Sequence, residues 1–261
     1  SDARAAYGGG ITIIGGNGLT MESSADLKAG ATTDLGGGRV TLDAGEGRLD
    51  VQGGAIDVAG GEGGKVRFRA RQVAGPDYVA VDALAAIITG ARSKVLEGVK
   101  VYENITTVDA ALRDAANVDA DAFIGNTAAV TARLNGAGGV ALMSGIEIRS
   151  AGDMTVTADW NLAGLSGHEG GLTLRAAGNL TVLGHISDGF SSADRSGALL
   201  DQASWDIRLV SGADFGSANP LAVRPIAALA AGSGSLIVGD TANGYQIRTG
   251  TGDIQVRAGG N

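Results

Sequence analysis

The sequence predicts an all-β fold, a right-handed parallel β-helix in which short strands stack coil upon coil. Three observations predict this solenoid. Glycine makes up 45 of the 261 residues, far above the usual level of about 7%. The apolar residues are mainly aliphatic, since aromatic residues make up only 4% of the chain. Finally, short strand-like triplets recur between glycine clusters, and narrow stacked strands pack best with aliphatic side chains.

The first run of coils is predicted over residues 1–71. Its strands share a triplet in which two apolar residues flank a polar one, and glycine clusters separate them: Ile11–Ile13, Leu19–Met21, Val40–Leu42, Leu49–Val51, Ile56–Val58 and Val66–Phe68. Because side chains alternate between the two faces of a strand, Leu42 and Val51 are expected to point inward, while Thr41 and Asp50 face water.

The second run of coils is predicted over residues 137–261, where a corner motif repeats in one register. The motif is glycine, then Asp or Asn, then an apolar, a polar and an apolar residue, as in Gly152–Val156, Gly178–Val182 and Gly252–Val256. The first two corners are 26 residues apart, which accommodates three short strands and their turns. Antiparallel hairpins are the rival interpretation, but the Asn-Gly and Asp-Gly dipeptides typical of their turns are sparse.

An insertion with one or two helices is predicted over residues 72–136, between the two runs. Residues 107–114 are rich in alanine, lack glycine and are preceded by a threonine, Thr106, that can serve as N-cap. Ala120–Leu134 carries apolar residues at helical spacing. A Ser-, Asp- and Gly-rich segment, 188–205, is predicted to be a surface loop. Both runs are expected to continue one solenoid in one structural domain. Since neither end resembles a cap, we expect a fragment of a longer chain.

Composition and charge narrow the classes of function. Collagen is excluded because glycine has no three-residue period, and a hydrophobic content of 44% argues against disorder. The net charge of -8 comes from scattered acidic residues, so nucleic acid is not an expected partner. No apolar run approaches the length of about 20 residues that crosses a bilayer, and no signal peptide opens the chain. The absence of cysteine fits export of an unfolded chain.

Several segments, taken in order with the helical insertion among them, resemble the filamentous haemagglutinin-type exoproteins of two-partner secretion. The resemblance is closest to a domain of unknown function towards the C-terminal part of these large surface adhesins. The segments that carry it span most of the chain: Gly90–Ser93, Glu97–Tyr102, Gly145–Ser150, Gly152–Asp153, Ala158–Trp160, Leu172–Leu180, Ser204–Trp205, Arg208–Asp214 and Arg248–Ile254.

The resemblance implies a β-helical shaft that is secreted and attached to, or released from, the surface of a Gram-negative bacterium. It implies an outer-membrane two-partner secretion transporter as the partner during export. It supplies no catalytic residue, and the N-terminal secretion domain of the family is not recognisable in this chain.

Two glycine-rich segments invite a binding hypothesis that their spacing does not support. Gly60–Lys65 is one residue too short for a phosphate-binding loop, and Val66 stands where Ser or Thr is required. Gly15–Met21 resembles a calcium-binding nonapeptide, but Thr20 replaces its Asp, which removes a carboxylate ligand. The sequence therefore predicts no cofactor.

His168 and His185 are the only histidines, and cysteine is absent. The usual nitrogen and sulfur ligands of a transition metal are therefore scarce, and no metal site is predicted. Catalytic residues are not predicted either, because no serine lies in a nucleophile elbow. Asn104 and Asn179 begin formal glycosylation sequons, although Asn179 fits better as a corner residue.

Trp160 and Trp205 could stack on sugar rings. The alternative that we favour is that each pins a neighbouring loop onto the coils. Polysaccharide-active β-helices also need clustered acidic residues with Arg or Lys on one strand face, whereas Asp50, Asp57 and Asp153 lie in separate corners or strands. No convergent basic partner is predicted for them.

The function expected from these features is structural and adhesive, and the protein is not expected to be an enzyme. The chain would form a shaft segment of a secreted bacterial surface exoprotein that attaches to host cells, neighbouring cells, surfaces or like molecules, for example in a biofilm. Two alternatives stay open. One is a self-assembling extracellular filament subunit, and the other is a β-helical polysaccharide lyase or hydrolase.

Overall fold

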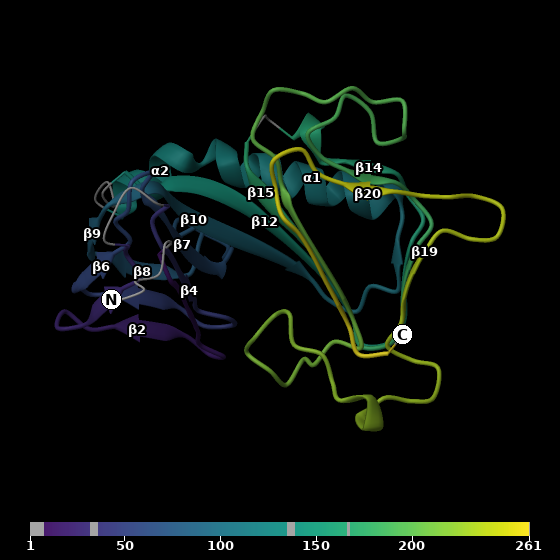
Figure 1. Cartoon of the computed structure of the whole chain (residues 1–261), viewed down its shortest axis with the longest axis horizontal. Coiled ribbons are helices and arrows are strands. Elements are labelled where there is room, and N and C mark those ends of the chain that lie inside the picture. Colours follow the sequence, from purple (N-terminus) through teal and green to yellow (C-terminus); the bar gives the residue numbers. More distant parts are fainter. Residues whose placement is uncertain (1–7, 32–35, 135–138, 166–167, 261) are drawn as a thin grey trace, which may run out of the picture. The chain divides into compact units, whose positions relative to one another are not determined.

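The computed structural model describes residues 8–31, 36–134, 139–165 and 168–260, and it consists mainly of strands in parallel sheets (Figure 1). The chain divides into two compact units. Unit 1 contains Ser1–Val99 and Gly125–Met143, and unit 2 contains Lys100–Ile124 and Ser144–Asn261. The chain passes from unit 1 into unit 2 within the long strand β10 (Ala91–Tyr102).

Unit 1 contains three parallel sheets. Their strand orders are β1-β4-β7-β10, β2-β5-β8 and β3-β6-β9, so the chain visits the three sheets in turn and each strand pairs with its counterpart from the next circuit. The strand bounds are β1 Gly10–Ile14, β2 Leu19–Met21, β3 Asp26–Lys28, β4 Arg39–Asp43, β5 Leu49–Val51, β6 Ala55–Asp57, β7 Gly64–Arg71, β8 Val81–Leu84 and β9 Ile87–Thr89. This order is compatible with the predicted solenoid.

In unit 1, the register of the strands places apolar residues opposite apolar residues on successive coils. Leu42 on β4 lies opposite Phe68 on β7, which lies opposite Leu96 on β10, and all three are buried. Close packing of successive circuits explains some of the glycines. A Cβ atom on Gly64 would lie only 2.3 Å from the carbonyl oxygen of Gly38, so no larger residue fits there without movement of the backbone.

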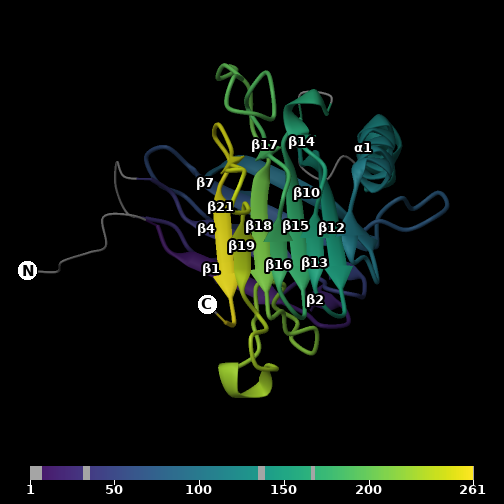
Figure 2. The same ribbon diagram turned by 90° about the vertical axis from the view of Figure 1, so that its right-hand side faces the viewer.

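Unit 2 repeats the same plan. Its sheets have the strand orders β12-β15-β18-β21, β11-β13-β16-β19 and β14-β17-β20, and Figure 2 shows β12, β15, β18 and β21 side by side. The strand bounds are β11 Thr107–Val108, β12 Ala141–Ser150, β13 Met154–Val156, β14 Trp160–Asn161, β15 Gly170–Ala176, β16 Leu180–Val182, β17 Ile186–Ser187, β18 Asp206–Ser211, β19 Leu236–Val238, β20 Ile247–Arg248 and β21 Ile254–Ala258. Two short 3-10 helices cover Leu162–Gly164 and Ile226–Ala228.

The core of unit 2 consists of aliphatic rows that run across its coils. One row contains Ile148, Leu174 and Leu209, which are register neighbours on β12, β15 and β18 and are fully buried. Trp160 and Trp205 belong to the same core cluster. The inward-facing apolar positions of the corner motifs, such as Leu180 and Val182, are buried as expected.

Both helices lie within the range 72–136. Helix α1 covers Ala110–Gly125, and helix α2 covers Thr127–Arg133. Thr106 does not cap α1, because strand β11 (Thr107–Val108) lies between it and the helix. The cap is Asp109, whose Oδ1 accepts a hydrogen bond from the backbone N–H of Leu112 at 2.9 Å. Neither described helix has the length and apolar character of a membrane span.

The helical segment, from Ala110 to Arg133, is shorter than the predicted insertion of 72–136. Strands β8, β9 and β10 lie inside that range and pair in parallel with β5, β6 and β7. The coils of unit 1 therefore continue beyond residue 71. The pattern is hard to recognise there because residues 79–89 contain no glycine and several alanines. Segment 188–205 joins β17 to β18 without a helix or strand, as predicted for a loop.

Candidate functional site

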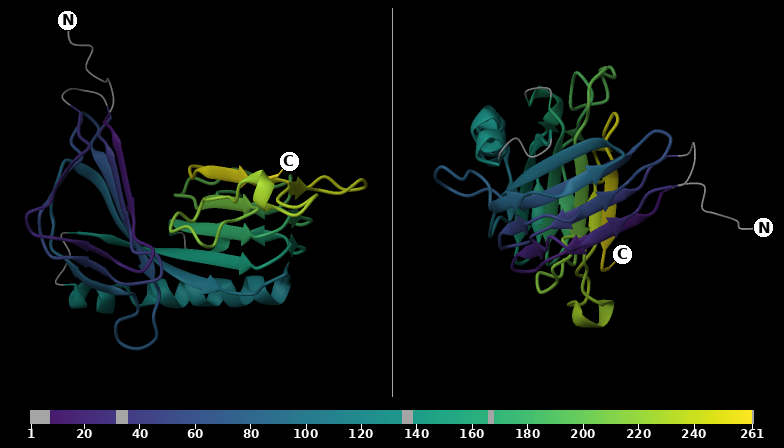
Figure 3. Two further views of the ribbon diagram at one scale, coloured as in Figure 1. Left: turned by 90° about the horizontal axis from the view of Figure 1, so that it is seen from below. Right: turned by 90° about the vertical axis from the view of Figure 1, so that its left-hand side faces the viewer.

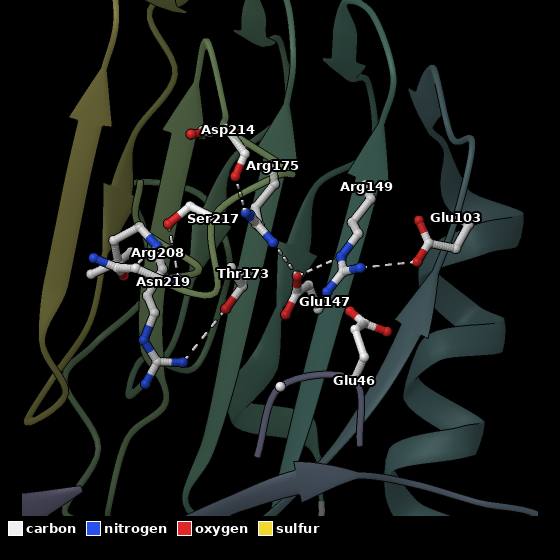
Figure 4. Close-up of polar contacts among 12 residues, drawn as sticks. Glu46, Glu103, Glu147, Arg149, Thr173, Arg175, Arg208, Asp214, Ser217 and Asn219 are labelled. Carbon is white, nitrogen blue, oxygen red and sulfur yellow. Dashed lines mark hydrogen bonds and ion pairs between the residues drawn. The ribbon is translucent and has the colours of Figure 1, made fainter. Parts of the chain in front are cut away.

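A row of charged side chains lies on the outer face of β12, β15 and β18 in unit 2 (Figure 4). Strand alternation turns these side chains away from the aliphatic rows. Glu147, Thr173 and Arg208 are register neighbours, and Arg149 stands opposite Arg175. Two arginines in direct opposition repel each other unless an acidic group lies between them.

Glu147 provides that acidic group. Its Oε1 accepts hydrogen bonds from Nε of Arg149 at 2.6 Å and from Nη1 of Arg175 at 3.0 Å. Glu147 is only 1% exposed and Arg175 only 3%. Nη1 of Arg149 also lies 3.1 Å from Oε1 of the more exposed Glu103. A buried carboxylate shared by two guanidinium groups links β12 to β15, the strands of two successive coils, on this face.

The loop that follows β18 packs against the same arginines. The guanidinium carbon of Arg175 lies 4.7 Å from the ring centre of Phe215, and that of Arg149 lies 5.9 Å from it. The carbonyl of Asp214 accepts a hydrogen bond from Nη2 of Arg175 at 3.2 Å. These cation–π and hydrogen-bond contacts fix the start of the loop, while the Phe215 ring stays 40% exposed.

Unit 1 has a charged row of its own. Asp43, Arg69 and Glu97 are register neighbours on β4, β7 and β10. Nη1 of Arg69 lies 2.8 Å from Oδ2 of Asp43, and its Nε lies 3.5 Å from Oε1 of Glu97. Glu97 also lies 3.4 Å from Arg67. Outward-facing charges on successive coils thus neutralise one another in both units.

These rows were missed by sequence reasoning, which considered Asp50, Asp57 and Asp153 and predicted no basic partner for them. Their carboxylates make local or corner contacts, with Gln52, with the N–H of Ala59 and with the N–H of Asn179 respectively. The buried acids that meet arginines in these rows are Asp43, Glu97 and Glu147. The available signal is the alternation of charged and apolar residues, as in Ile146–Arg149.

The corners of unit 2 carry ladders of polar side chains. Oδ1 of Asp153 accepts the N–H of Asn179 at 2.7 Å, and Oδ1 of Asn179 accepts the N–H of Ser235 at 2.9 Å. Asn179 is thus a corner residue, as favoured over the glycosylation hypothesis. The other sequon asparagine, Asn104, is exposed and has a positive φ of 60°.

His185 belongs to a second corner ladder. Its backbone N–H donates to Oδ1 of Asp159 at 2.7 Å, and its Nδ1 accepts the N–H of Gln246 at 3.2 Å. His168 lies beside Trp205 and Glu169 at a small cavity under α1. Across the part of the chain that the structure describes, no group of three or more His, Asp or Glu residues could hold a metal ion.

Neither tryptophan offers a surface for sugar stacking. Trp160 is fully buried, and its Nε1 donates to Oδ1 of Asn117 on α1 at 2.9 Å. Trp205 is 2% exposed and lies against Gly170, where a Cβ atom would fall 2.2 Å from the indole ring. Trp160 thus holds α1 onto the coils, whereas Trp205 packs against β15 and its buried Nε1 has no hydrogen-bond partner among the described residues.

The glycine-rich segments form coil corners and strands. Gly60–Lys65 turns into the first residues of β7, and Gly15–Met21 leads into and includes β2.

The site with the most buried charge is the outer row around Glu147. Its acidic group is occupied by arginines, which makes it a cross-coil clamp rather than an acid–base pair facing a substrate.

Comparison with known proteins finds no relative. No protein-family model matches the sequence, and no curated protein and no solved structure matches it.

Proposed function

We propose that this chain is a segment of a right-handed parallel β-helical shaft in a secreted bacterial surface exoprotein of the filamentous haemagglutinin type. The observation that carries the proposal is the repeated three-sheet pairing, in which each strand meets its counterpart from the next circuit in both units. A stack of this kind has its backbone hydrogen bonds along the axis, which gives stiffness in the direction of the shaft.

The adhesive part of the function is assigned to the loops of unit 2. The loop 188–205 and the longer segment 212–235 leave the coils between strands and carry exposed residues, among them Leu199 and Ile226. A rigid scaffold that presents loops is a common arrangement for binding. The partners proposed are a surface ligand on host or neighbouring cells and, during export, an outer-membrane transporter. The proposed location is the surface of a Gram-negative bacterium.

A binding assay tests the adhesive function. The purified chain, labelled with a fluorophore, is titrated onto epithelial cells and onto Gram-negative cells, and saturable binding is expected. Replacement of residues 192–197 by two glycines removes most of this loop and should therefore weaken binding. The shortened loop can still close, because the backbone N–H of Ser191 donates to the carbonyl of Ala198 at 3.0 Å. Circular dichroism checks that the coils persist. Absence of saturable binding to every cell type would contradict the proposal.

The proposal also holds that the chain is not an enzyme. Incubation with acidic and neutral polysaccharides should release no product, because the buried acid of the charged row is held by two arginines. Turnover by the purified chain that is lost in Glu147→Gln, but kept in the exposed control Glu103→Gln, would favour the lyase or hydrolase alternative.

Self-assembly is the second candidate function. It is favoured by apolar side chains that are 43–47% exposed on β19 and β21, namely Ile237, Val238, Ile254 and Val256. Light scattering over a wide concentration range distinguishes the two candidates. Growth of particle mass with concentration supports a filament subunit, whereas a constant monomer mass contradicts it.

A further inference from the structure

The strands at the edges of the sheets have free carbonyl groups that another chain could pair with. Within the described residues, β8 is the last strand of the sheet β2-β5-β8, and β14 is the first strand of the sheet β14-β17-β20. Each of these edges faces a helix of the insertion. We infer that the insertion caps one strand edge in each unit: α2 covers β8 in unit 1 and α1 covers β14 in unit 2, each through an arginine that binds outward-facing backbone carbonyls.

In unit 1 the arginine is Arg133, the last residue of α2. Its Nη1 donates to the carbonyl of Val81 at 2.8 Å. Its Nη2 donates at 3.3 Å to the carbonyl of Val79, just before β8, which also accepts the backbone N–H of Val81 at 2.8 Å. The carbonyl of Ala80 points the other way and accepts the N–H of Leu49 on β5 at 2.9 Å. Because carbonyls alternate in direction along a strand, Arg133 occupies the side of β8 that faces away from its sheet.

Arg133 is not the only group at this edge. Nη2 of Arg48 also reaches the carbonyl of Val81, at 3.5 Å, and its Nε is paired with Asp82 at 2.6 Å. Helix α2 itself is anchored by Val130, which is fully buried. The helix therefore presents Arg133 from a fixed position rather than from a free loop.

In unit 2 the corresponding arginine is Arg113 on the first turns of α1. Its Nη1 donates to the carbonyl of Asp159 at 2.8 Å. The next backbone N–H, that of Trp160, donates to the carbonyl of His185 on the opposite side at 2.7 Å. The carbonyl of Asp159 therefore faces away from the sheet, as the carbonyls of Val79 and Val81 do. One turn further along α1, Asn117 binds the Trp160 side chain.

The apolar side of α1 closes the core as well as the strand edge. Ala116 and Ala120 are buried in the same cluster as Val108, Ile146 and Met154, and Leu112 packs against it. Alanines at this spacing lie on one side of a helix and let its backbone approach the coils closely. On the same helix, Oδ2 of Asp119 accepts a hydrogen bond from the hydroxyl of Tyr102 at 2.5 Å. Figure 3 shows α1 along the end of unit 2 opposite to β21.

The sequence explains why one insertion can do both tasks. A single residue, Asn126, separates α1 from α2, and the division between the units falls at this point, between Ile124 and Gly125. Each helix closes the unit to which it belongs by its own contacts. The predicted result is that a second copy of the chain cannot add to the covered edges at β8 and β14.

Variants that remove the guanidinium groups test the inference. Arg133→Met keeps the length of the side chain and removes its donors, and Arg113→Met does the same in unit 2. Hydrogen exchange of the β8 amides should become about tenfold faster or more in Arg133→Met, since hydrogen bonds to charged groups are worth about 1.5–3 kcal/mol. Light scattering should show concentration-dependent association that the parent chain does not show to the same degree.

The matched control is Arg92→Met, because Arg92 is half exposed and pairs only at 3.5 Å with the exposed Glu62. Its exchange rates and mass should equal those of the parent. Arg133→Lys is used as the conservative variant, and it should restore part of the protection because an ammonium group can still donate to one carbonyl. Unchanged exchange at β8 and unchanged mass in Arg133→Met, or equal effects in Arg92→Met, would overturn the inference.

Discussion

The two ends of unit 2 differ in how they are covered. At the end closed by α1, Val108 on β11 is fully buried, as Ala116 on the helix is. At the other end, Ile254 and Val256 on β21 are each 43% exposed. Both lie in rows whose other members, such as Leu209 on β18, are fully buried. An apolar side chain in such a row is therefore not buried by its own coil alone. It is buried only where a neighbouring coil or a helix covers it on both sides.

The first and largest prediction compares two valines in one row. Val182 on β16 and Val238 on β19 are register neighbours, but Val182 is buried and Val238 is 44% exposed. Val182→Asp should lower the free energy of unfolding by about 3–5 kcal/mol, because it buries an unpaired charge. Val238→Asp should change it by less than about 1 kcal/mol, since the carboxylate reaches water. Urea denaturation measures both, and equal losses would break the comparison.

The second prediction uses deletion of side-chain volume instead of charge. Leu209→Ala should cost about 2–5 kcal/mol through the cavity that it leaves. Val256→Ala, at the neighbouring position on β21, should cost less than about 1 kcal/mol because solvent already reaches that side chain. Thermal unfolding followed by circular dichroism gives the two shifts. A larger loss for Val256→Ala would mean that another layer covers β21 in solution.

The third prediction concerns the end closed by α1. Ala116→Leu should destabilise unit 2 by about 1–3 kcal/mol, because the helix has no room for a larger side chain against the core. Ala111→Leu is the matched control on the exposed side of the same helix and should be nearly neutral. If Ala116→Leu were equally neutral, α1 would not be a tightly packed cover.

The fourth and smallest prediction compares two carboxyl groups. Burial raises the pKa of Asp188, although hydrogen bonds from the backbone of Trp205 and Gly189 oppose that effect. Its protonated form is thus favoured in the fold, and its contribution to stability falls as the pH rises above the ordinary value of 3.8. The exposed Asp240 has its pKa lowered by the backbone N–H groups of Asn243 and Ala242, so its contribution is lost as the pH falls.

Stability measured between about pH 3 and pH 7 in Asp188→Asn and Asp240→Asn tests these signs. Relative to the parent, Asp188→Asn should gain stability as the pH rises through this range. Asp240→Asn should lose stability over the same interval. The same sign for both variants would contradict the assigned environments.

The strands of the coils could be predicted from the sequence because their signal is local. The triplets Val40–Leu42 and Leu49–Val51 lie within β4 and β5, and the corner motifs lead directly into β13, β16 and β21. Period-2 alternation and glycine corners need no knowledge of distant residues. The same holds for Asn179, whose position in its motif identified it as a corner residue.

The charged rows could not be predicted in the same way. Glu147 and Arg175 are 28 residues apart, and their contact depends on the register between two coils. That register is set by the lengths of the intervening turns and loops, which no local pattern specifies. Strands β8 and β9 were missed for a different reason, since their alanines and the lack of glycine resemble the helical segment that follows. The edge-cap contacts of Arg113 and Arg133 likewise join residues more than 40 positions apart.

The most direct test of the central claim is a disulfide formed across two coils. The chain has no native cysteine, and Thr155 on β13 is the register partner of Thr181 on β16. Parallel neighbours lie within the Cα separation of about 4.4–6.8 Å that disulfides span. Thr155→Cys combined with Thr181→Cys should crosslink readily in the native protein, whereas Thr155→Cys combined with Thr173→Cys, on a different sheet, should not. Failure of the first pair, or crosslinking of the second, would contradict the stacked parallel coils.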